Sequence, residues 1–348
     1  MTAEPPPTTN GAADSNARTN ANETPLRTGV VGVGSMGENH ARVYGELRGV
    51  ELAGVFDLND EVARDVAATY GTEARSFDDL LERCDAVTVA VPTAAHYDTV
   101  SACLEAGVHV LVEKPIAETV EEGRALAELA DERDLVLQVG HIERFNPAVQ
   151  TAIDLIDEQD LEVIAVDAER LGPPVDRTET AGVIPDLMIH DVDVIGALLE
   201  AEAESIAAKR TADGRYATAA IEYGDVIASL TASRTTQKKI RRLTVTAAEC
   251  LIEVDYLSQE VLIHRDSYPE YVTADGQSRF RHESVVERPR VDNGEPLKHE
   301  LGSFVESIRT GTAPEVSAED GLEALGIVEA IGRIADGDSE RREQEVRL

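Results

Sequence analysis

The sequence GVVGVGSMG occupies residues 29–37, where a short apolar run passes through three glycines into a helical stretch. The segment Gly32-Val33-Gly34-Ser35-Met36-Gly37 has the spacing G-x-G-x-x-G, which permits a tight turn and lets backbone N–H groups approach a pyrophosphate. The dipole of the following helix attracts the same anion. A simple glycine turn is the alternative interpretation. The strand before the motif and the helix after it favour dinucleotide binding.

An acidic residue follows the glycine motif at the expected distance of ~20 residues, at the end of the next apolar strand. This residue is Asp57. Its carboxylate can accept hydrogen bonds from both hydroxyls of an adenosine ribose, and it would repel a 2′-phosphate. The motif therefore predicts NAD as the cofactor in preference to NADP.

The first half of the chain alternates short apolar strands with helices. We expect strands at residues 29–33, 51–56, 86–91, 109–112 and 135–139, and helices at residues 36–47, 59–70, 95–106 and 119–133. Near-continuous apolar strands separated by helices indicate a parallel sheet that is covered on both faces. The fold class is therefore α/β, with an N-terminal Rossmann domain whose parallel sheet is doubly wound.

The pattern changes after about Asn146. Helices at 146–156 and 186–199 are followed by expected strands at 205–210, 216–223, 226–233, 243–248, 251–256 and 261–265, and by helices at 296–310 and 318–335. Strands without intervening helices predict a C-terminal α+β domain with a large, mainly antiparallel, open-faced sheet. We divide the chain into a disordered N-terminal extension (1–26), an NAD-binding Rossmann domain (27–146) and a domain for substrate binding and oligomerisation (147–348).

The chain is strongly acidic. Its 348 residues include 67 acidic and 32 basic side chains, which gives a formal net charge of -35. Such a field repels phosphate backbones and anionic lipid surfaces, so we expect neither nucleic acid nor membrane partners. The acidic residues are spread along the chain, as in proteins adapted to a high-salt cytoplasm, where salt screens self-repulsion. Solvated helix faces with no environmental meaning are the alternative.

Cysteine usage and hydropathy bear on the compartment. The three cysteines, Cys84, Cys103 and Cys250, form no C-x-x-C pair, which argues against a disulfide framework and against a zinc site. We expect no metal. The chain has no run of 18 apolar residues, and its first 26 residues lack the features of a signal peptide. We therefore expect a cytoplasmic protein.

Two further motifs carry groups suited to proton transfer. The tripeptide Glu113-Lys114-Pro115 ends a parallel strand, at the sheet edge where ligands bind in open α/β folds. A structural salt bridge followed by a helix-starting proline is the alternative. Asp186 and His190 are spaced i and i+4, which places both on one helical face. An ordinary buried histidine, or a zinc site with a third ligand, would have the same spacing.

The motifs taken together resemble the glucose-fructose oxidoreductase/inositol dehydrogenase (Gfo/Idh/MocA) family. They are the glycine motif, Asp57, the segment Pro92-Thr93-Ala94-Ala95-His96, Glu113-Lys114-Pro115 and the Asp186/His190 pair. Residues 139–147, 184–195 and 239–245 resemble the branch of that family that contains UDP-N-acetylglucosamine 3-dehydrogenases.

The resemblance implies roles for individual residues. Lys114 and His190 would flank the reacting carbinol, and Asp186 would orient the histidine or the sugar. Either Lys114 or His190 can be the base, since a desolvated amine and an imidazole both exchange protons near neutral pH. The cofactor site would comprise the following residues: Gly32, Gly34, Ser35, Met36, Gly37, Asp57, Pro92, Thr93, His96, Glu113 and Lys114.

A nucleotide-sugar diphosphate needs cations inside this acidic protein. Candidates near the motifs are Arg144, Arg170, Lys239 and Arg241, while His141 and Asn146 are candidate sugar contacts. Each cation could instead pair with a surface acid, His141 could simply cap the sheet, and Asn146 could cap a helix.

The leading hypothesis is an NAD-dependent enzyme that oxidises the 3-hydroxyl of UDP-N-acetylglucosamine. A dehydrogenase of a free sugar or inositol, and a non-catalytic NAD-sensing regulator, are the alternatives; the retention of both Lys114 and His190 argues against the regulator. An open sheet face commonly packs against another subunit, so we also expect a homodimer or homotetramer.

Overall fold

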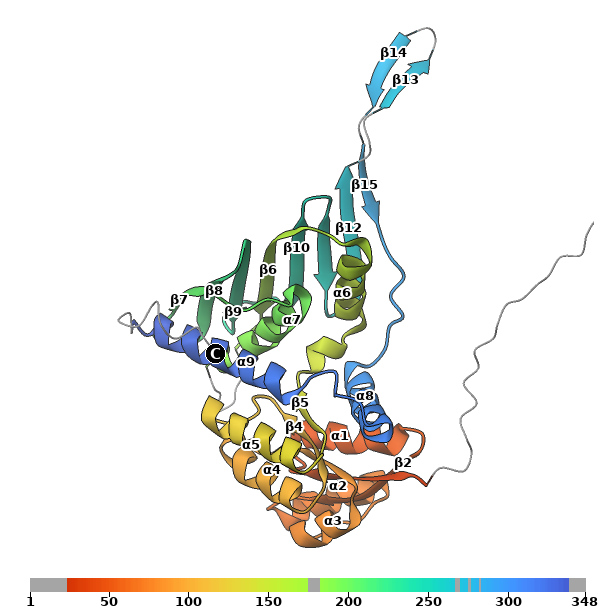
Figure 1. Cartoon of the computed structure of the whole chain (residues 1–348), viewed down its shortest axis with the longest axis vertical. Helices are drawn as coiled ribbons and strands as arrows, with labels where there is room; N and C mark the ends of the chain where they lie inside the picture. The colour runs from red at the N-terminus through yellow and green to blue at the C-terminus, as the bar shows by residue number, and fades with distance from the viewer. Residues whose placement is uncertain (1–23, 175–181, 267–269, 275–276, 282, 338–348) are drawn as a thin grey trace, which may run out of the picture.

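The computed structural model describes residues 24–174, 182–266, 270–274, 277–281 and 283–337. Residues 1–23, which make up most of the predicted N-terminal extension, lie outside the described residues. The first strand, β1, begins at Leu26. Two sheets organise the chain, with the N-terminal one in the lower half of Figure 1 and the second above it.

The N-terminal sheet has five strands in the order β2-β1-β3-β4-β5, and every neighbouring pair is parallel. The strands are β1 (Leu26–Val31), β2 (Val50–Phe56), β3 (Ala86–Val89), β4 (His109–Glu113) and β5 (Leu137–Gly140). The connecting helices are α1 (Ser35–Glu46), α2 (Asp60–Tyr70), α3 (Phe77–Arg83), α4 (His96–Glu105) and α5 (Val120–Glu132). This arrangement confirms the predicted Rossmann fold; α3, with Ser76 as its N-cap, was not predicted.

The helix boundaries follow local chemistry. Asn59 caps α2 by accepting hydrogen bonds from the backbone N–H groups of Glu61 and Val62, and α2 ends at Gly71 in the left-handed conformation, with φ of 68°. Thr119 caps α5 by accepting from the N–H of Glu122. These capping residues lie where the sequence predicted them.

The second sheet has eight strands in the order β15-β12-β11-β10-β6-β9-β8-β7. The strands are β6 (Val163–Leu171), β7 (Ser205–Arg210), β8 (Tyr216–Tyr223), β9 (Val226–Ser233), β10 (Ile240–Ala247), β11 (Leu251–Asp255), β12 (Glu260–Asp266) and β15 (Ser284–Glu287). The β6–β9 pair is parallel and the other pairs are antiparallel, which confirms a mainly antiparallel sheet.

Helices cover one face of the second sheet. Helices α6 (Pro147–Gln159) and α7 (Ile189–Leu199) lie in front of it in Figure 1, and the π-helical turn η3 (Ile184–Met188) leads into α7. Along β8, exposed and buried residues alternate strictly, so one face is packed and the other is open. The strands β13 (Glu270–Ala274) and β14 (Gln277–Arg281) form a separate hairpin that projects beyond the sheet (Figure 1).

The last two helices connect the two halves of the protein. Helix α8 (Pro296–Thr310) returns to the N-terminal sheet, where Leu301 and Phe304 are fully buried in the same core as Val30 of β1. Helix α9 (Ala318–Ala335) packs on α5 and also on α7 and β7. Elements from the C-terminal end of the chain therefore pack on both halves of the protein.

Candidate functional site

The turn after β1 has the geometry that a dinucleotide needs. Gly32 has a φ of 84°, and a Cβ atom there would lie 2.8 Å from the backbone oxygen of Ala90. A Cβ atom on Gly37 would lie 1.8 Å from the backbone oxygen of Gly32, so the helix can approach the strand this closely only with glycine. Gly34 has open space beside it and, with Ser35, is exposed at the N-terminus of α1. The residues present therefore fit a pyrophosphate.

Asp57 lies in the same crevice. Its Oδ2 accepts a 2.9 Å hydrogen bond from the N–H of Val33, and its Oδ1 accepts one of 2.9 Å from the N–H of Asn59. A cavity of about 740 Å³ brings Asp57 together with the glycine turn, Pro92, Leu58 and Asp98. The residue after Asp57 is Leu58, which is 95% exposed at the same cavity. Because leucine is uncharged, position 58 supplies no positive charge that could bind a 2′-phosphate.

His96 is turned away from the crevice. The residue is buried, with Nδ1 at 2.8 Å from the backbone oxygen of Pro115 and Nε2 at 2.9 Å from that of Val91. It thus links the end of β3 to the turn that follows Lys114. Burial lowers the pKa of His96. Its neighbour Thr93, also predicted to contact the cofactor, is half-buried in the 3-10 turn η1 (Thr93–Ala95).

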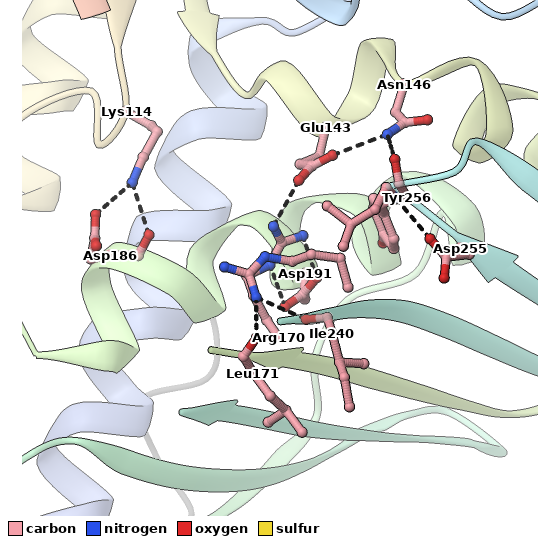
Figure 2. Close-up of polar contacts among 12 residues, drawn as sticks. Lys114, Glu143, Asn146, Arg170, Leu171, Asp186, Asp191, Ile240, Asp255 and Tyr256 are labelled. Atoms are coloured by element: carbon pink, nitrogen blue, oxygen red, sulfur yellow. Dashed lines mark hydrogen bonds and ion pairs between the residues drawn. The ribbon is translucent and has the colours of Figure 1, made fainter. Parts of the chain in front are cut away.

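Lys114 crosses from the N-terminal sheet to the second half of the protein. Its Nζ donates to the backbone oxygen of Asp186 at 2.9 Å and to Oδ1 of the same residue at 3.0 Å (Figure 2). The other carboxylate oxygen of Asp186 forms an ion pair with Arg234. Asp186 belongs to η3, a π-helical turn of a kind that is frequent at functional sites. The predicted helix over 186–199 thus begins with a π turn.

The two candidate proton-transfer groups have different electrostatic environments. Burial lowers the pKa of Lys114 to about 8; Glu113 opposes this shift, while Arg170 and Arg234 favour it. Burial lowers the pKa of His190 well below its usual range, and the charges of Lys114 and Arg170 lower it further. The His190 ring is therefore neutral, and its buried Nδ1 has no hydrogen-bond partner among the described residues.

Arg170 belongs to a buried network of polar side chains (Figure 2). Its Nε and Nη2 donate to the two carboxylate oxygens of Asp191 at 2.9 and 2.7 Å, and its Nη1 donates to Glu143 at 2.7 Å. The guanidinium also lies 5.3 Å from the ring centroid of Tyr256. Two carboxylates therefore neutralise a cation that sequence reasoning assigned to a substrate diphosphate.

Arg144 and Asn146 also have partners inside the protein. Arg144 is 8% exposed and donates from Nε and Nη2 to the carboxylate of Asp193 at 3.2 and 2.7 Å. Asn146 is buried, caps α6 by accepting from the N–H of Ala148, and donates to the backbone oxygen of Tyr256. The capping alternative for Asn146 is thus the geometry observed.

His141, another predicted sugar contact, is fully buried after β5. Neither of its ring nitrogens has a hydrogen-bond partner within the described ranges, and Nδ1 lies 4.0 Å from Asp193. Burial lowers its pKa, as do the charges of Arg144 and Lys114.

Arg241 and Lys239 are placed differently from the two buried arginines. Arg241 lies opposite Arg170 in the β10–β6 register, and its Nη1 donates to the backbone oxygens of Leu171 and Ile240. In the part of the chain that the structure describes, Arg241 forms no ion pair with a carboxylate. Lys239 is exposed just before β10.

Sequence reasoning missed His40 and Arg234. His40 lies on α1, three residues after the glycine motif, is fully buried, and has Nε2 at 2.9 Å from Oε1 of Glu113. The only sequence signal was a histidine on the inward face of an amphipathic helix. Arg234 directly follows β9, and nothing in its local sequence indicates Asp186 as its partner.

The fold and the site define an oxidoreductase that binds a nicotinamide dinucleotide, with a lysine at the end of β4 that contacts the element leading into the helix of His190. Residues 26–141 match the family described as an oxidoreductase family with an NAD-binding Rossmann fold (Gfo/Idh/MocA). The chain is 39% identical over 246 residues to the UDP-N-acetylglucosamine 3-dehydrogenase of Acidithiobacillus ferrooxidans, covering 69% of this chain and 77% of that protein. The protein belongs to the Gfo/Idh/MocA family and is an NAD-dependent dehydrogenase.

Other comparisons agree with this assignment. The solved structure of the same Acidithiobacillus ferrooxidans enzyme superposes with a TM-score of 0.78 at 33% identity, covering 89% of this chain and 97% of that one. Inositol 2-dehydrogenase of Rhizobium meliloti is 29% identical over 325 residues, which is 88% of this chain and 96% of that protein.

No described helix is long and apolar enough to cross a membrane. Within the described ranges, no group of three or more acidic, histidine or cysteine side chains could hold a metal ion.

Proposed function

We propose that the protein oxidises the 3-hydroxyl of UDP-N-acetylglucosamine to the 3-keto sugar, with NAD⁺ as the hydride acceptor. The observation that carries this proposal is the pairing of the Lys114 amine with Asp186, one helical turn before His190. A relative with that activity is similar over most of its length. The glycine turn and Asp57 would hold the cofactor, and Pro92 lines the same cavity.

Lys114 is the group best suited to be the base. A general base is most effective when its pKa lies near the working pH, and the pKa of Lys114 is lowered to about 8. The pKa of His190 is lowered well below its usual range, so the ring would serve as a neutral hydrogen-bonding partner for the sugar hydroxyl. Asp186 would hold the amine in place.

The proposed step balances protons and electrons. The neutral Lys114 amine takes the proton of the sugar hydroxyl, and the C–H bond of the same carbon breaks with its electron pair. When bound, nicotinamide supplies the acceptor for that hydride. The carbinol becomes a ketone, and Lys114 becomes an ammonium that later releases its proton to solvent.

Arg241 and Lys239 are the proposed contacts to the diphosphate. Guanidinium groups suit phosphate oxygens. Arg241 donates hydrogen bonds to backbone oxygens, whereas Arg144 and Arg170 donate to carboxylates. Binding a phosphate to either buried arginine would require breaking an ion pair. We therefore assign Arg144 and Arg170 to the support of the site.

We also propose that the open face of the second sheet packs against another copy of the chain in a homodimer or homotetramer. Its exposed side chains include Ile164 (48% exposed) and Ile227 (52% exposed) on the neighbouring strands β6 and β9. Exposed apolar side chains that lie close together on an open sheet support a protein contact.

A substrate screen at high, constant salt tests the proposed function. Absorbance of the reduced nicotinamide would be followed with UDP-N-acetylglucosamine, myo-inositol and glucose. Reduction of NAD⁺ with the nucleotide sugar supports the proposal. Reduction with a free polyol alone would favour the second candidate, an inositol dehydrogenase, which the similarity to the Rhizobium meliloti enzyme supports.

A further inference from the structure

A buried polar pair lies directly behind the catalytic lysine. Glu113 is the last residue of β4 and Lys114 follows it directly, and the side chains of these neighbours reach in different directions. Lys114 reaches Asp186, while Glu113 reaches α1, where its Oε1 lies 2.9 Å from Nε2 of His40. The His40 side chain is fully buried and that of Glu113 is 13% exposed.

A second carboxyl group shares this interior. Glu300 of α8 is fully buried, and neither of its carboxyl oxygens has a hydrogen-bond partner in the part of the chain that the structure describes. Burial raises the pKa of Glu300 well above its usual range, and the charges of Glu113 and Asp193 raise it further. Two enclosed carboxyl groups near each other do not both ionise, so Glu300 holds the proton.

The negative charge therefore resides on Glu113. Burial disfavours that charge, but the hydrogen bond from His40 and the charges of His40 and Lys114 outweigh burial, and the pKa of Glu113 is lowered. His96 adds a smaller effect of the same sign. The cofactor-binding helix thus supplies, through His40, the group that keeps Glu113 ionised.

We propose that His40 and Glu113 are positioning residues that set the proton affinity of the Lys114 amine, with Glu113 as the fixed negative charge and His40 as the donor that maintains it. This inference rests on the proposed function, in which Lys114 is the base. The charged or titratable groups that face Lys114 are Glu113, Asp186, His190, His141, Arg170 and Arg234. Those that face Glu113 are His40, Lys114, His96, His141 and Glu300.

The sign of the effect of Glu113 on the pKa of Lys114 follows from the charges of the two groups. Glu113 stabilises the ammonium form of Lys114 and so raises its pKa against burial. If Glu113 loses its charge, or loses the His40 hydrogen bond and takes up a proton, the ammonium loses that support. The amine then stays neutral at lower pH, and the acid limb of kcat/KM moves to lower pH.

Four variants of the full chain, with NAD⁺ bound, test the proposal. Glu113→Gln and His40→Leu are expected to move the midpoint of the acid limb down by roughly one pH unit. This is the lower end of the pKa shifts that a nearby opposite charge causes. His40→Gln, which can still donate to Glu113, is expected to restore the midpoint. Glu300→Gln is the matched control, since it replaces a buried neutral acid with a neutral amide and should leave the midpoint in place. If Glu113→Gln leaves the midpoint unmoved, or if Glu300→Gln moves it as far, the proposal is overturned.

A second measurement separates this inference from the proposed function. The rate at which acetic anhydride acetylates Lys114, followed by mass spectrometry across pH, reports the proton affinity of the amine without turnover. A downward shift of this midpoint in Glu113→Gln and His40→Leu supports the inference even if Lys114 is not the base. Equal midpoints in wild type and both variants overturn the inference even if Lys114 is the base.

Discussion

The Nζ atom of Lys114 lies 3.0 Å from Oδ1 of Asp186 and 2.9 Å from the backbone oxygen of the same residue. An ammonium group has three donors, so this geometry uses two of them and leaves one for a substrate oxygen. Lys114 directly follows strand β4 of the N-terminal sheet, and Asp186 precedes the helix that carries His190. The contact therefore joins the N-terminal sheet to the element that leads into the helix of His190 in the second half of the chain.

Replacing the lysine tests its assignment as base. Lys114→Ala is expected to lower kcat by at least ~10²-fold, the lower end of general acid–base contributions, while the Kd for NAD⁺ changes much less. Stopped-flow or steady-state turnover gives the first quantity, and fluorescence titration of NADH binding approximates the second. Turnover that is unchanged would remove Lys114 from the chemistry.

The pH dependence distinguishes the lysine from the histidine. Only the neutral amine can accept a proton, so kcat/KM should rise with pH through about 8, where the buried Lys114 titrates. His190 remains neutral over this range because its pKa is lowered well below the usual value. Turnover measured with saturating NAD⁺ at constant ionic strength gives the profile. A single acid limb centred near the ordinary histidine value would instead point to His190 as the base.

Cofactor choice should depend on the charge at the end of β2. Asp57→Asn keeps an oxygen that can accept from the N–H of Val33 but removes the repulsion of a 2′-phosphate. The ratio of kcat/KM for NADP⁺ to that for NAD⁺ is expected to rise about tenfold. This corresponds to a change of about 1.4 kcal/mol in the relative transition-state free energies with the two cofactors. Asp60→Ala, an exposed acid just beyond the crevice, is the control. An unaltered ratio in Asp57→Asn would contradict the role given to this carboxylate.

Sequence patterns predicted most of the second sheet but not its central strand. Strands β7, β8 and β9 begin and end at the predicted residues because their alternation is regular and turn signals separate them. Strand β6 was missed although Val166 and Ala168 alternate inward, since the next inward position is Arg170. A charged residue at an inward position interrupts the apolar alternation by which a strand is predicted from sequence.

Prediction from sequence was likewise limited for the individual side chains of the site. Lys114, Asp186 and His190 were grouped through the resemblance to the Gfo/Idh/MocA family, whereas helical spacing by itself related only Asp186 to His190. The partners of the buried arginines could not be identified, since Asp191 is 21 residues from Arg170 and Asp193 is 49 residues from Arg144. Whether an arginine binds substrate or a carboxylate depends on such long-range contacts, which local sequence does not encode.

The proposed diphosphate contact can be tested against its neighbour in the strand. Arg241→Leu is expected to raise the KM for UDP-N-acetylglucosamine by about tenfold or more, the effect of losing a hydrogen bond to a charged group. Arg242→Leu is the matched control, because Arg242 is 44% exposed and lies near Glu169. Competition by UDP provides a second reading, since its affinity should fall in Arg241→Leu alone. Equal KM values in the two variants would rule Arg241 out as a phosphate contact.

The ion pair between Arg144 and Asp193 should behave as part of the core. Arg144→Met leaves the Asp193 carboxylate buried without its main partner, which is expected to cost about 3–5 kcal/mol in the free energy of unfolding. Adding Asp193→Leu removes the stranded charge, so the double variant should recover most of that loss. Urea unfolding at constant high salt, compared through midpoints at equal slope, gives both values. If Arg144→Met keeps wild-type stability and instead raises the KM for the nucleotide sugar, Arg144 is a substrate contact and its assignment to structural support is wrong.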